Sequence, residues 1–419
     1  MLTDYRTLSR VVGLSALLAW SATATAQTRG GVPHLDLEMT SEEYRALTEK
    51  LTDLESDDPL QTILLIGKRN LDWIEYINAE RPDDQKLALS SPALQNGYPI
   101  DAPTFANRTI ISDQWDAVRI ALPAFIKAVV VDNADFTRDI PMTDEEFLTQ
   151  LRLVDRAYQR ASRWLLQEPY LEYYTASSWE DVRGYYHLQR EENLMRRLAG
   201  WNNLDAATKA RLEPLLIGQC RNDERSVEAC RTELQGAVSS NAVHVFYNRY
   251  LDIARAHWDS FFKIPTSRTD VTWTAENPDL ATIPFTNPNN PSVLAWLRDN
   301  IQDEWRFGSW ALQLVFTEEA GDGITHVVFE PGATPHVNDI AGSIITMDGN
   351  RNINEYSSRW TIRHEYGHVL GFPDCYLEFF DAEAGVMINY QLDITDLMCS
   401  RKGHLKEGHY NEMKRVYFR

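Results

Sequence analysis

Two histidines and an aspartate near the C-terminus have the types and spacing of metal ligands. His364 and His368 stand four residues apart, so on a helix their side chains lie one turn apart on the same face. Gly371 follows three residues later and Pro373 cannot continue a helix, so the chain must turn and can bring Asp374 back towards both imidazoles. Two imidazoles and one carboxylate leave the fourth tetrahedral position open, as a catalytic zinc ion requires.

The neighbouring residues fit this interpretation. Glu365 follows the first histidine and is placed to hold and deprotonate a water molecule in the open position. Ile362, Tyr366 and Val369 fall on the opposite helix face, where they can anchor the segment in a core. An amphipathic helix with two solvated histidines is the plainer alternative, and the extension of the pattern to Asp374 argues against it.

The segment from His364 to Asp374, His-Glu-Tyr-Gly-His-Val-Leu-Gly-Phe-Pro-Asp, resembles the long zinc motif of the metzincin clan of metallopeptidases. It is most similar to the variant with Asp as the third ligand, as in the snapalysin-type small secreted bacterial proteases. The segment Asp396-Leu397-Met398-Cys399-Ser400 resembles the methionine turn of these enzymes, with Met398 placed 24 residues after Asp374. The resemblance covers roughly the last third of the chain and is strong only within these motifs.

The resemblance implies specific roles. His364, His368 and Asp374 would be the zinc ligands, Glu365 the general base and Met398 the turn methionine. Many metzincins carry a tyrosine two residues after this methionine that assists the transition state, but here Ser400 stands in that place. Any tyrosine with this role would be another one, and Tyr376, Tyr390 and Tyr410 remain open as candidates. A thermolysin-like layout, with a downstream ligand such as Glu383, is the nearest enzymatic alternative.

Four cysteines in an exported chain predict two disulfides. Cys220 and Cys230 enclose a short charged segment and are expected to pair with each other. In metzincins the segments after the third ligand and around the turn methionine lie one above the other below the zinc. The resemblance therefore implies a bond between Cys375 and Cys399, and the competing idea that these two thiolates bind the metal would remove the open position that Glu365 implies.

The first 26 residues read as a signal peptide. Arg6 and Arg10 form a basic start, Val11 to Trp20 form a short apolar run, and Ala24-Thr25-Ala26 gives the small-residue cleavage pattern before Gln27. The apolar run is too short for a membrane span, so we expect cleavage near Ala26 and no stable membrane insertion afterwards. The protein is therefore expected to be secreted or periplasmic.

Composition narrows the class of protein. The chain has 419 residues, of which 43% are hydrophobic. The part after the expected signal peptide is too long to form a single ordinary hydrophobic core, so two domains are expected. A formal charge of −20 argues against binding to nucleic acid or to anionic membrane surfaces. The charge would favour cationic substrates only weakly, because a solvated acidic surface is its commoner cause. The expected partner is a peptide or protein substrate.

The first half is predicted to be mostly helical, from Ser41 to Phe262. Thr143-Asp144-Glu145-Glu146 has the pattern of a capping box at the start of a helix. A long loop is expected between Ser91 and Asp113, where Pro, Gly and Asn are frequent. Further helices are expected at Gln61–Asn78, Leu151–Leu166, Trp179–Leu198 and Ala242–Phe262.

The second half begins with Pro265 to Pro291, whose five prolines indicate a linker or an extended crossover. A helix is then expected at Val293–Trp305, followed by strands at Trp310–Phe316, Thr325–Phe329 and Ser343–Met347. By resemblance, Ala341–Asp348 would be an edge strand that binds an extended substrate. His326, His336, His404 and His409 share no ligand spacing and are expected on the surface or in loops.

We therefore expect an α+β fold with a helical domain over residues 27–264, either accessory or a pro-region, and a metzincin-like catalytic domain over 265–419. The catalytic domain would contain a small mixed sheet, the zinc helix and the methionine turn. The expected function is that of a secreted zinc-dependent endopeptidase with Glu365 as its base. The alternative is an exported helical binding or scaffold protein with a vestigial zinc site.

Overall fold

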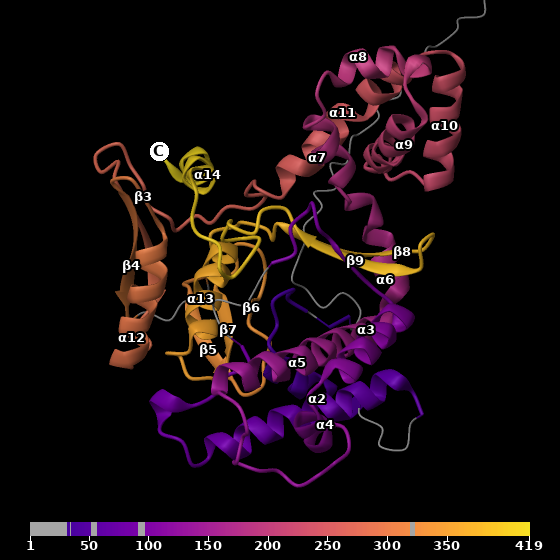
Figure 1. The fold of residues 1–419 in the computed structure, drawn as a ribbon. Helices are drawn as coiled ribbons and strands as arrows, with labels where there is room; N and C mark the ends of the chain where they lie inside the picture. The colour runs from indigo at the N-terminus through magenta and orange to yellow at the C-terminus, as the bar shows by residue number, and fades with distance from the viewer. Residues whose placement is uncertain (1–31, 34, 52–56, 91–96, 319–322) are drawn as a thin grey trace, which may run out of the picture.

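The computed structural model describes residues 32–33, 35–51, 57–90, 97–318 and 323–419 (Figure 1). The expected signal peptide lies outside these residues. The fold is α+β, as expected, with helices in the first half and small sheets in the second. No helix within the described ranges combines the length and apolarity needed to cross a membrane.

The first helical group forms one hydrophobic core. Leu and Ile side chains of α2 pack against α5, and Trp73 meets Phe147 edge to face at 4.9 Å between ring centroids. The predicted capping box is present at the start of α5, because Thr143 and Glu146 each accept the other's backbone N–H. The group consists of α1 (Ser41–Thr48), α2 (Pro59–Asn78), α3 (Arg108–Ala121), α4 (Ala124–Val130), α5 (Asp144–Gln167) and α6 (Leu171–Ala176).

A second helical group has its own core and stands apart at the upper right of Figure 1. The expected helix Trp179–Leu198 is interrupted, because Asn193 takes a left-handed conformation with φ of 55° and separates α7 from α8. The predicted disulfide between Cys220 and Cys230 joins α9 to α10. The group consists of α7 (Arg183–Gln189), α8 (Leu194–Ala199), α9 (Ala206–Arg221), α10 (Val227–Ser239) and α11 (Val243–Ser260).

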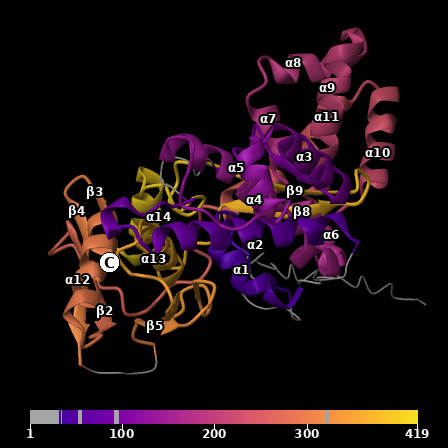
Figure 2. The same ribbon diagram turned by 60° about the horizontal axis from the view of Figure 1, so that its bottom comes forward.

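The second half contains the three strands expected from the sequence and further strands that were not expected. β2 (Leu280–Thr286) lies within the stretch interpreted as a linker and pairs in parallel with β4 (Trp310–Thr317), beside α12 (Pro291–Leu297) (Figure 2). Ala281, Ile283 and Phe285 are buried in alternation with less buried residues, which is the period of a strand. The prolines around it obscured this pattern. The short β3 (Arg306–Phe307) pairs with the start of β4.

The strand before the helix that carries His364 and His368 has neighbours on both sides. β7 (Ile344–Asp348) pairs in parallel with β5 (His326–Glu330) and antiparallel with β6 (His336–Val337). The expectation that Ala341–Asp348 forms a sheet edge open to a peptide is therefore wrong. The short strand β6, which was not predicted, pairs with that side of β7.

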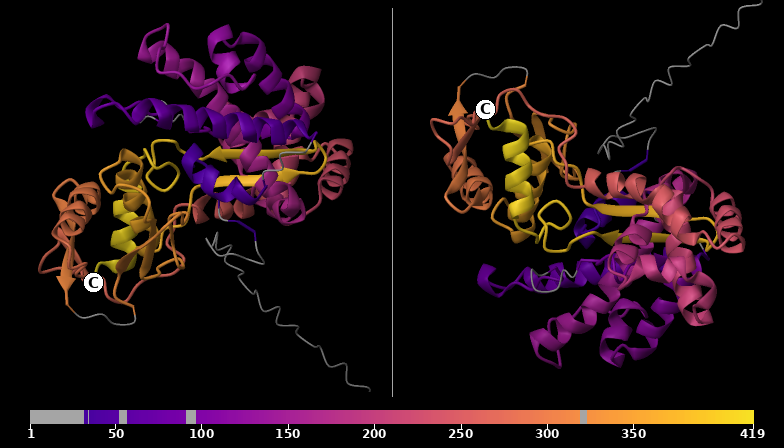
Figure 3. Two further views of the ribbon diagram at one scale, coloured as in Figure 1. Left: turned by 90° about the horizontal axis from the view of Figure 1, so that it is seen from below. Right: turned by 90° about the horizontal axis from the view of Figure 1, so that it is seen from above.

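A hairpin near the C-terminus connects the two halves of the molecule. β8 (Tyr376–Asp381) pairs with β9 (Val386–Gln391), and β9 pairs on its other side with β1 (Thr104–Ala106) from the expected long loop. Met387 of β9 belongs to the core of the first helical group, and Figure 3 shows the yellow hairpin beside these purple helices. The packing thus crosses the expected boundary between residues 264 and 265. Two further helices, α13 (Tyr356–Val369) and α14 (Glu407–Tyr417), complete the second half.

Candidate metal centre

Helix α13 presents the two histidines from a fully buried position. Ile362, Tyr366 and Val369 are 0% exposed and anchor the opposite face in the core, as the spacing predicts. The helix ends at Val369, and Gly371, two residues later, has a φ of +94° that favours glycine. A Cβ at Gly371 would also lie 2.3 Å from the carbonyl oxygen of Thr266, so the chain can turn this tightly only without a side chain.

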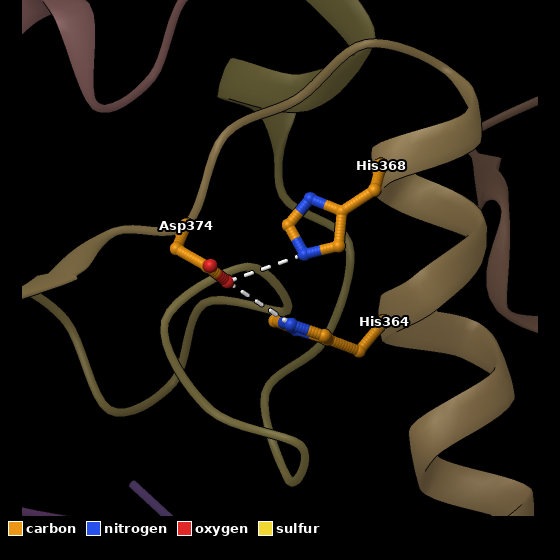
Figure 4. Close-up of side chains that lie close together, drawn as sticks. All are labelled: His364, His368 and Asp374. Carbon is orange, nitrogen blue, oxygen red and sulfur yellow. Dashed lines mark ion pairs between the residues drawn. The ribbon is translucent and has the colours of Figure 1, made fainter. Parts of the chain in front are cut away.

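The turn brings Asp374 back to the histidines (Figure 4). Oδ1 of Asp374 lies 3.1 Å from Nε2 of His364 and 3.3 Å from Nε2 of His368. A tetrahedral zinc ion with ligand bonds of about 2.0–2.1 Å would set its ligand atoms about 3.3–3.4 Å apart. The three side chains are buried and could hold a metal ion. The two separations from Asp374 Oδ1 are close to those that such an ion would set.

Hydrogen bonds on the far side of each ring orient the imidazoles. Nδ1 of His364 donates to the carbonyl oxygen of Leu397 and Nδ1 of His368 to that of Phe372, both at 2.8 Å. In the neutral rings the Nε2 lone pairs therefore face Asp374 Oδ1. This buried oxygen accepts no well-formed hydrogen bond from the described part of the chain. Two lone pairs and a carboxylate oxygen directed at one point are the donor set of a cation site.

The electrostatic potential around His364 and His368 favours positive charge at this site. Burial opposes ionisation of Asp374, but the adjacent His368 and His364 outweigh it and lower the pKa of Asp374 from its ordinary value. Burial also opposes the charging of His364, yet the adjacent Asp374 raises the pKa of His364 to about 10, with smaller contributions from Glu365 and Asp36. The three carboxylates thus create a buried region of negative potential around the histidine nitrogens.

Glu365 is buried beside this group and 3% exposed. Its charge acts on both His364 and His368. Among the described residues, none forms a hydrogen bond or ion pair with the Glu365 carboxylate. A buried carboxylate without a protein partner is costly to maintain, and at a metal centre it is available to accept a proton.

The loop after β9 lies directly below α13. A Cβ at Gly367 would be 2.2 Å from Sδ of Met398, so the sulfur packs against the helix backbone between the two histidines. The backbone N–H of Cys375 donates to the carbonyl oxygen of Met398 at 3.0 Å. The disulfide between Cys375 and Cys399, with Cα atoms 4.4 Å apart, holds the two segments together as expected. Because both sulfurs are bonded to each other, the nearby group of these cysteines with Asp396 offers no thiolate to a metal.

Of the three candidate tyrosines, the structure brings one to the centre. Burial, followed by the negative charge of the adjacent Asp374, raises the pKa of Tyr376 well above its ordinary value. Tyr390 is used elsewhere, since its hydroxyl donates to Asp181 at 2.8 Å. Tyr410 stacks on the ring of Phe307 with centroids 5.2 Å apart. The hydroxyl of Ser400 donates to a carboxylate of the N-terminal segment, described next.

The N-terminal segment also reaches this site, which no sequence pattern predicted. Nε of Arg401 is 2.8 Å from Oδ2 of Asp36, and the Arg401 side chain is only 2% exposed. Glu38 accepts the backbone N–H of Arg401 at 2.6 Å and the hydroxyl of Ser400 at 2.7 Å. Burial alone would raise the pKa of Asp36, but the positive charges of Arg401 and His364 outweigh burial and lower this pKa. These contacts join residues more than 360 positions apart, and no local pattern predicts them.

Two further expectations need correction. His409, expected on the surface or in a loop, is buried in α14 with Nε2 3.1 Å from Oδ1 of Asp396, which also accepts the backbone N–H of Met398. Its ring therefore supports the loop below the histidines. Glu383 lies in the β8–β9 turn, where its half-exposed carboxylate pairs with Arg231 at 2.8 Å, so the thermolysin-like alternative has no ligand there. The remaining three, His326, His336 and His404, are half-buried or exposed, as expected.

Comparison with protein-family models, with curated proteins and with solved structures found no match to this chain.

Proposed function

We propose that the protein is a secreted zinc-dependent endopeptidase. The observation that carries this proposal is the convergence of His364 Nε2, His368 Nε2 and Asp374 Oδ1 at separations that suit a tetrahedral zinc ion. A set of two imidazoles and one carboxylate is typical of catalytic rather than structural zinc, because it leaves a position for solvent or substrate. The resemblance of the same segment to the metzincin motif supports this assignment.

The zinc ion would polarise a peptide carbonyl and lower the pKa of a water molecule at its open position. Glu365 would accept a proton from the attacking water on its carboxylate and then deliver it to the nitrogen of the leaving amine. Its lack of a protein partner supports this role, since a carboxylate that only stabilised the fold would be paired. Tyr376 is the tyrosine that we propose for contact with the developing negative charge.

Met398 would act as the turn methionine of this site. Its sulfur packs against Gly367, which has no side chain and so permits the close approach. The two disulfides agree with export to an oxidising compartment, as the N-terminal sequence predicts. The side chains of His364, Glu365, His368 and Asp374 are at most 8% exposed. Entry of a peptide therefore requires the surrounding segments to move apart.

The test compares wild type with Glu365→Gln. Both proteins should bind one zinc ion per chain by metal analysis, but the variant should cleave a peptide library at least about 100-fold more slowly. Glu383→Gln, a matched change at an exposed carboxylate, should leave cleavage unchanged. A chelator should abolish wild-type cleavage, and zinc should restore it.

Other results would contradict the proposal. Full activity of Glu365→Gln would remove the mechanism. Zinc binding without cleavage of any peptide by wild type would favour the alternative, an exported helical binding or scaffold protein with a vestigial site. Absence of bound zinc would exclude the zinc-dependent mechanism.

A further inference from the structure

The guanidinium of Arg401 is almost fully buried, yet the described residues use only part of it. Nε lies 2.8 Å from Oδ2 of Asp36, and Nη1 lies 3.3 Å from Oε1 of Glu43. Nη2 is also buried, but it forms no hydrogen bond with any residue that the structure describes. A buried donor without a partner is costly, so such a group is usually met by a ligand or by water.

Contacts at both ends of Arg401 place it beside the proposed metal site. Its carbonyl oxygen accepts a hydrogen bond at 3.1 Å from Nη2 of Arg363, the residue that directly precedes His364. At the other end, Asp36 holds the guanidinium and is close enough to act on the charge of His364. The negative charge of Glu365 in turn acts on the Arg401 guanidinium. The unused Nη2 therefore belongs to the surroundings of the proposed base.

The same region thus holds a buried acceptor and a buried donor that do not bond to each other. The Glu365 carboxylate has no protein partner among the described residues, and neither has Nη2 of Arg401. The hydroxyl of Tyr376 lies against the Asp374 carboxylate, so that donor is already engaged. Hydrolysis of a peptide bond needs both kinds of group, a base for the attacking water and a donor for the carbonyl oxygen.

The positive charge of Arg401 is compensated where it stands. Asp36 and Glu43 contact the guanidinium, and Glu38 accepts the backbone N–H of the same residue. These carboxylates offset a charge that would otherwise repel a cation held by the histidines. A guanidinium also keeps its proton at any physiological pH. Arg401 can therefore offer an N–H donor to this site without adding net positive charge.

We propose that Arg401 is a further catalytic residue, whose Nη2 donates a hydrogen bond to the carbonyl oxygen of the scissile peptide bond. The inference rests on the proposed peptidase function. As the water oxygen bonds to the carbonyl carbon, the π electrons of the C=O bond move to the carbonyl oxygen and one water proton moves to Glu365. Arg401 transfers no proton, and its hydrogen bond strengthens as negative charge grows on that oxygen.

The test compares the zinc-loaded full chain with Arg401→Lys and with Ser400→Ala. Lysine keeps one positive charge for Asp36 but has a single nitrogen, so kcat should fall about 100-fold while KM stays within about threefold. Calorimetry then measures the affinity for a phosphinic analogue of the cleaved peptide, which carries a tetrahedral anion at the scissile position. This affinity should fall in Arg401→Lys by about the same factor as kcat. Ser400→Ala removes a neighbouring contact to the N-terminal segment and should change neither quantity.

A double variant separates catalysis from folding. Arg401→Gln/Asp36→Asn removes both charges of the pair, so neither is left buried alone. It should retain a cooperative urea transition and one bound zinc ion, with kcat lowered about 100-fold. The inference is wrong, and the proposed function stands, if wild type cleaves the peptide and Arg401→Lys shows the same kcat and the same affinity for the analogue. If wild type binds zinc but cleaves no peptide, both are wrong.

Discussion

The disulfide beside the proposed third ligand allows one prediction to be made in detail. Replacing Cys375 and Cys399 by alanine removes a cross-link that spans 24 residues. The loop-closure model assigns such a cross-link about 3.4 kcal/mol of the unfolding free energy. The second disulfide, between Cys220 and Cys230, spans 10 residues and is assigned about 2.7 kcal/mol by the same model. The two double variants should therefore lose similar amounts of stability.

Their effects on metal binding should differ. Cys375 follows Asp374 directly, and Cys399 follows Met398, which packs against the helix that carries both histidines. The bond thus fixes the third ligand relative to the loop whose Leu397 carbonyl orients His364. Loss of such supporting contacts commonly weakens metal affinity by about 10–100-fold. The other disulfide lies in the second helical group and supports no proposed ligand.

The assay has two parts. Urea unfolding of the metal-free proteins measures the stability lost by each double variant. Competition with a chromophoric chelator then measures zinc affinity in the absence of urea. We expect weaker zinc binding only in the Cys375→Ala/Cys399→Ala variant, with Cys220→Ala/Cys230→Ala equal to wild type. Equal zinc affinity in all three proteins would show that the disulfide stabilises the fold without positioning Asp374.

Three further predictions follow from buried charges. Arg163→Met should lower the free energy of unfolding by about 3–5 kcal/mol in urea, because it leaves the Glu378 carboxylate buried without its partner at 2.6 Å. The double variant Arg163→Met/Glu378→Leu should recover part of this loss, and no recovery would contradict the role given to the pair. Burial raises the pKa of Asp155 to about 7 from 3.8, so stability should fall by up to about 4 kcal/mol as the pH rises from 4 to 7. Asp155→Asn should flatten this decline and the exposed Asp252→Asn should not, and a wild-type unfolding midpoint independent of pH would refute the assignment. N-terminal sequencing of secreted material should find a start before Asp36, whereas a start near residue 263 would identify the helical half as a pro-region.

Features encoded within short segments were predictable from the sequence. The spacing of His364 and His368 and the bend at Gly371 predicted a site that the structure brings together. The capping box at Thr143 was equally local, since its two partners are three residues apart. The disulfide between Cys220 and Cys230 also joins neighbouring segments. In each case the residues that interact lie close in sequence, so their types and spacing determine the contact.

Features that depend on distant partners were not predictable. The period of two in β2 was present in the sequence, but its prolines made the stretch resemble a linker. The prediction that Ala341–Asp348 is an edge strand was wrong, because strand propensity says nothing about which strands lie on either side. Pairing of β1 with β9 joins residues about 285 positions apart, and only the folded chain brings them together.

Contacts of the N-terminal segment join the two halves of the chain beside the proposed metal site. Arg401 follows the loop below α13 and is almost fully buried, so it needs a negative partner. Asp36 and Glu43 supply that partner, at 2.8 and 3.3 Å from its guanidinium. The charge of Asp36 also raises the pKa of His364, which means that it favours positive charge at the proposed metal site. Removal of the helical half would leave Arg401 unpaired beside a site built to attract a cation, where its own charge would oppose metal binding. The carboxylates of the N-terminal segment are therefore best understood as part of the centre.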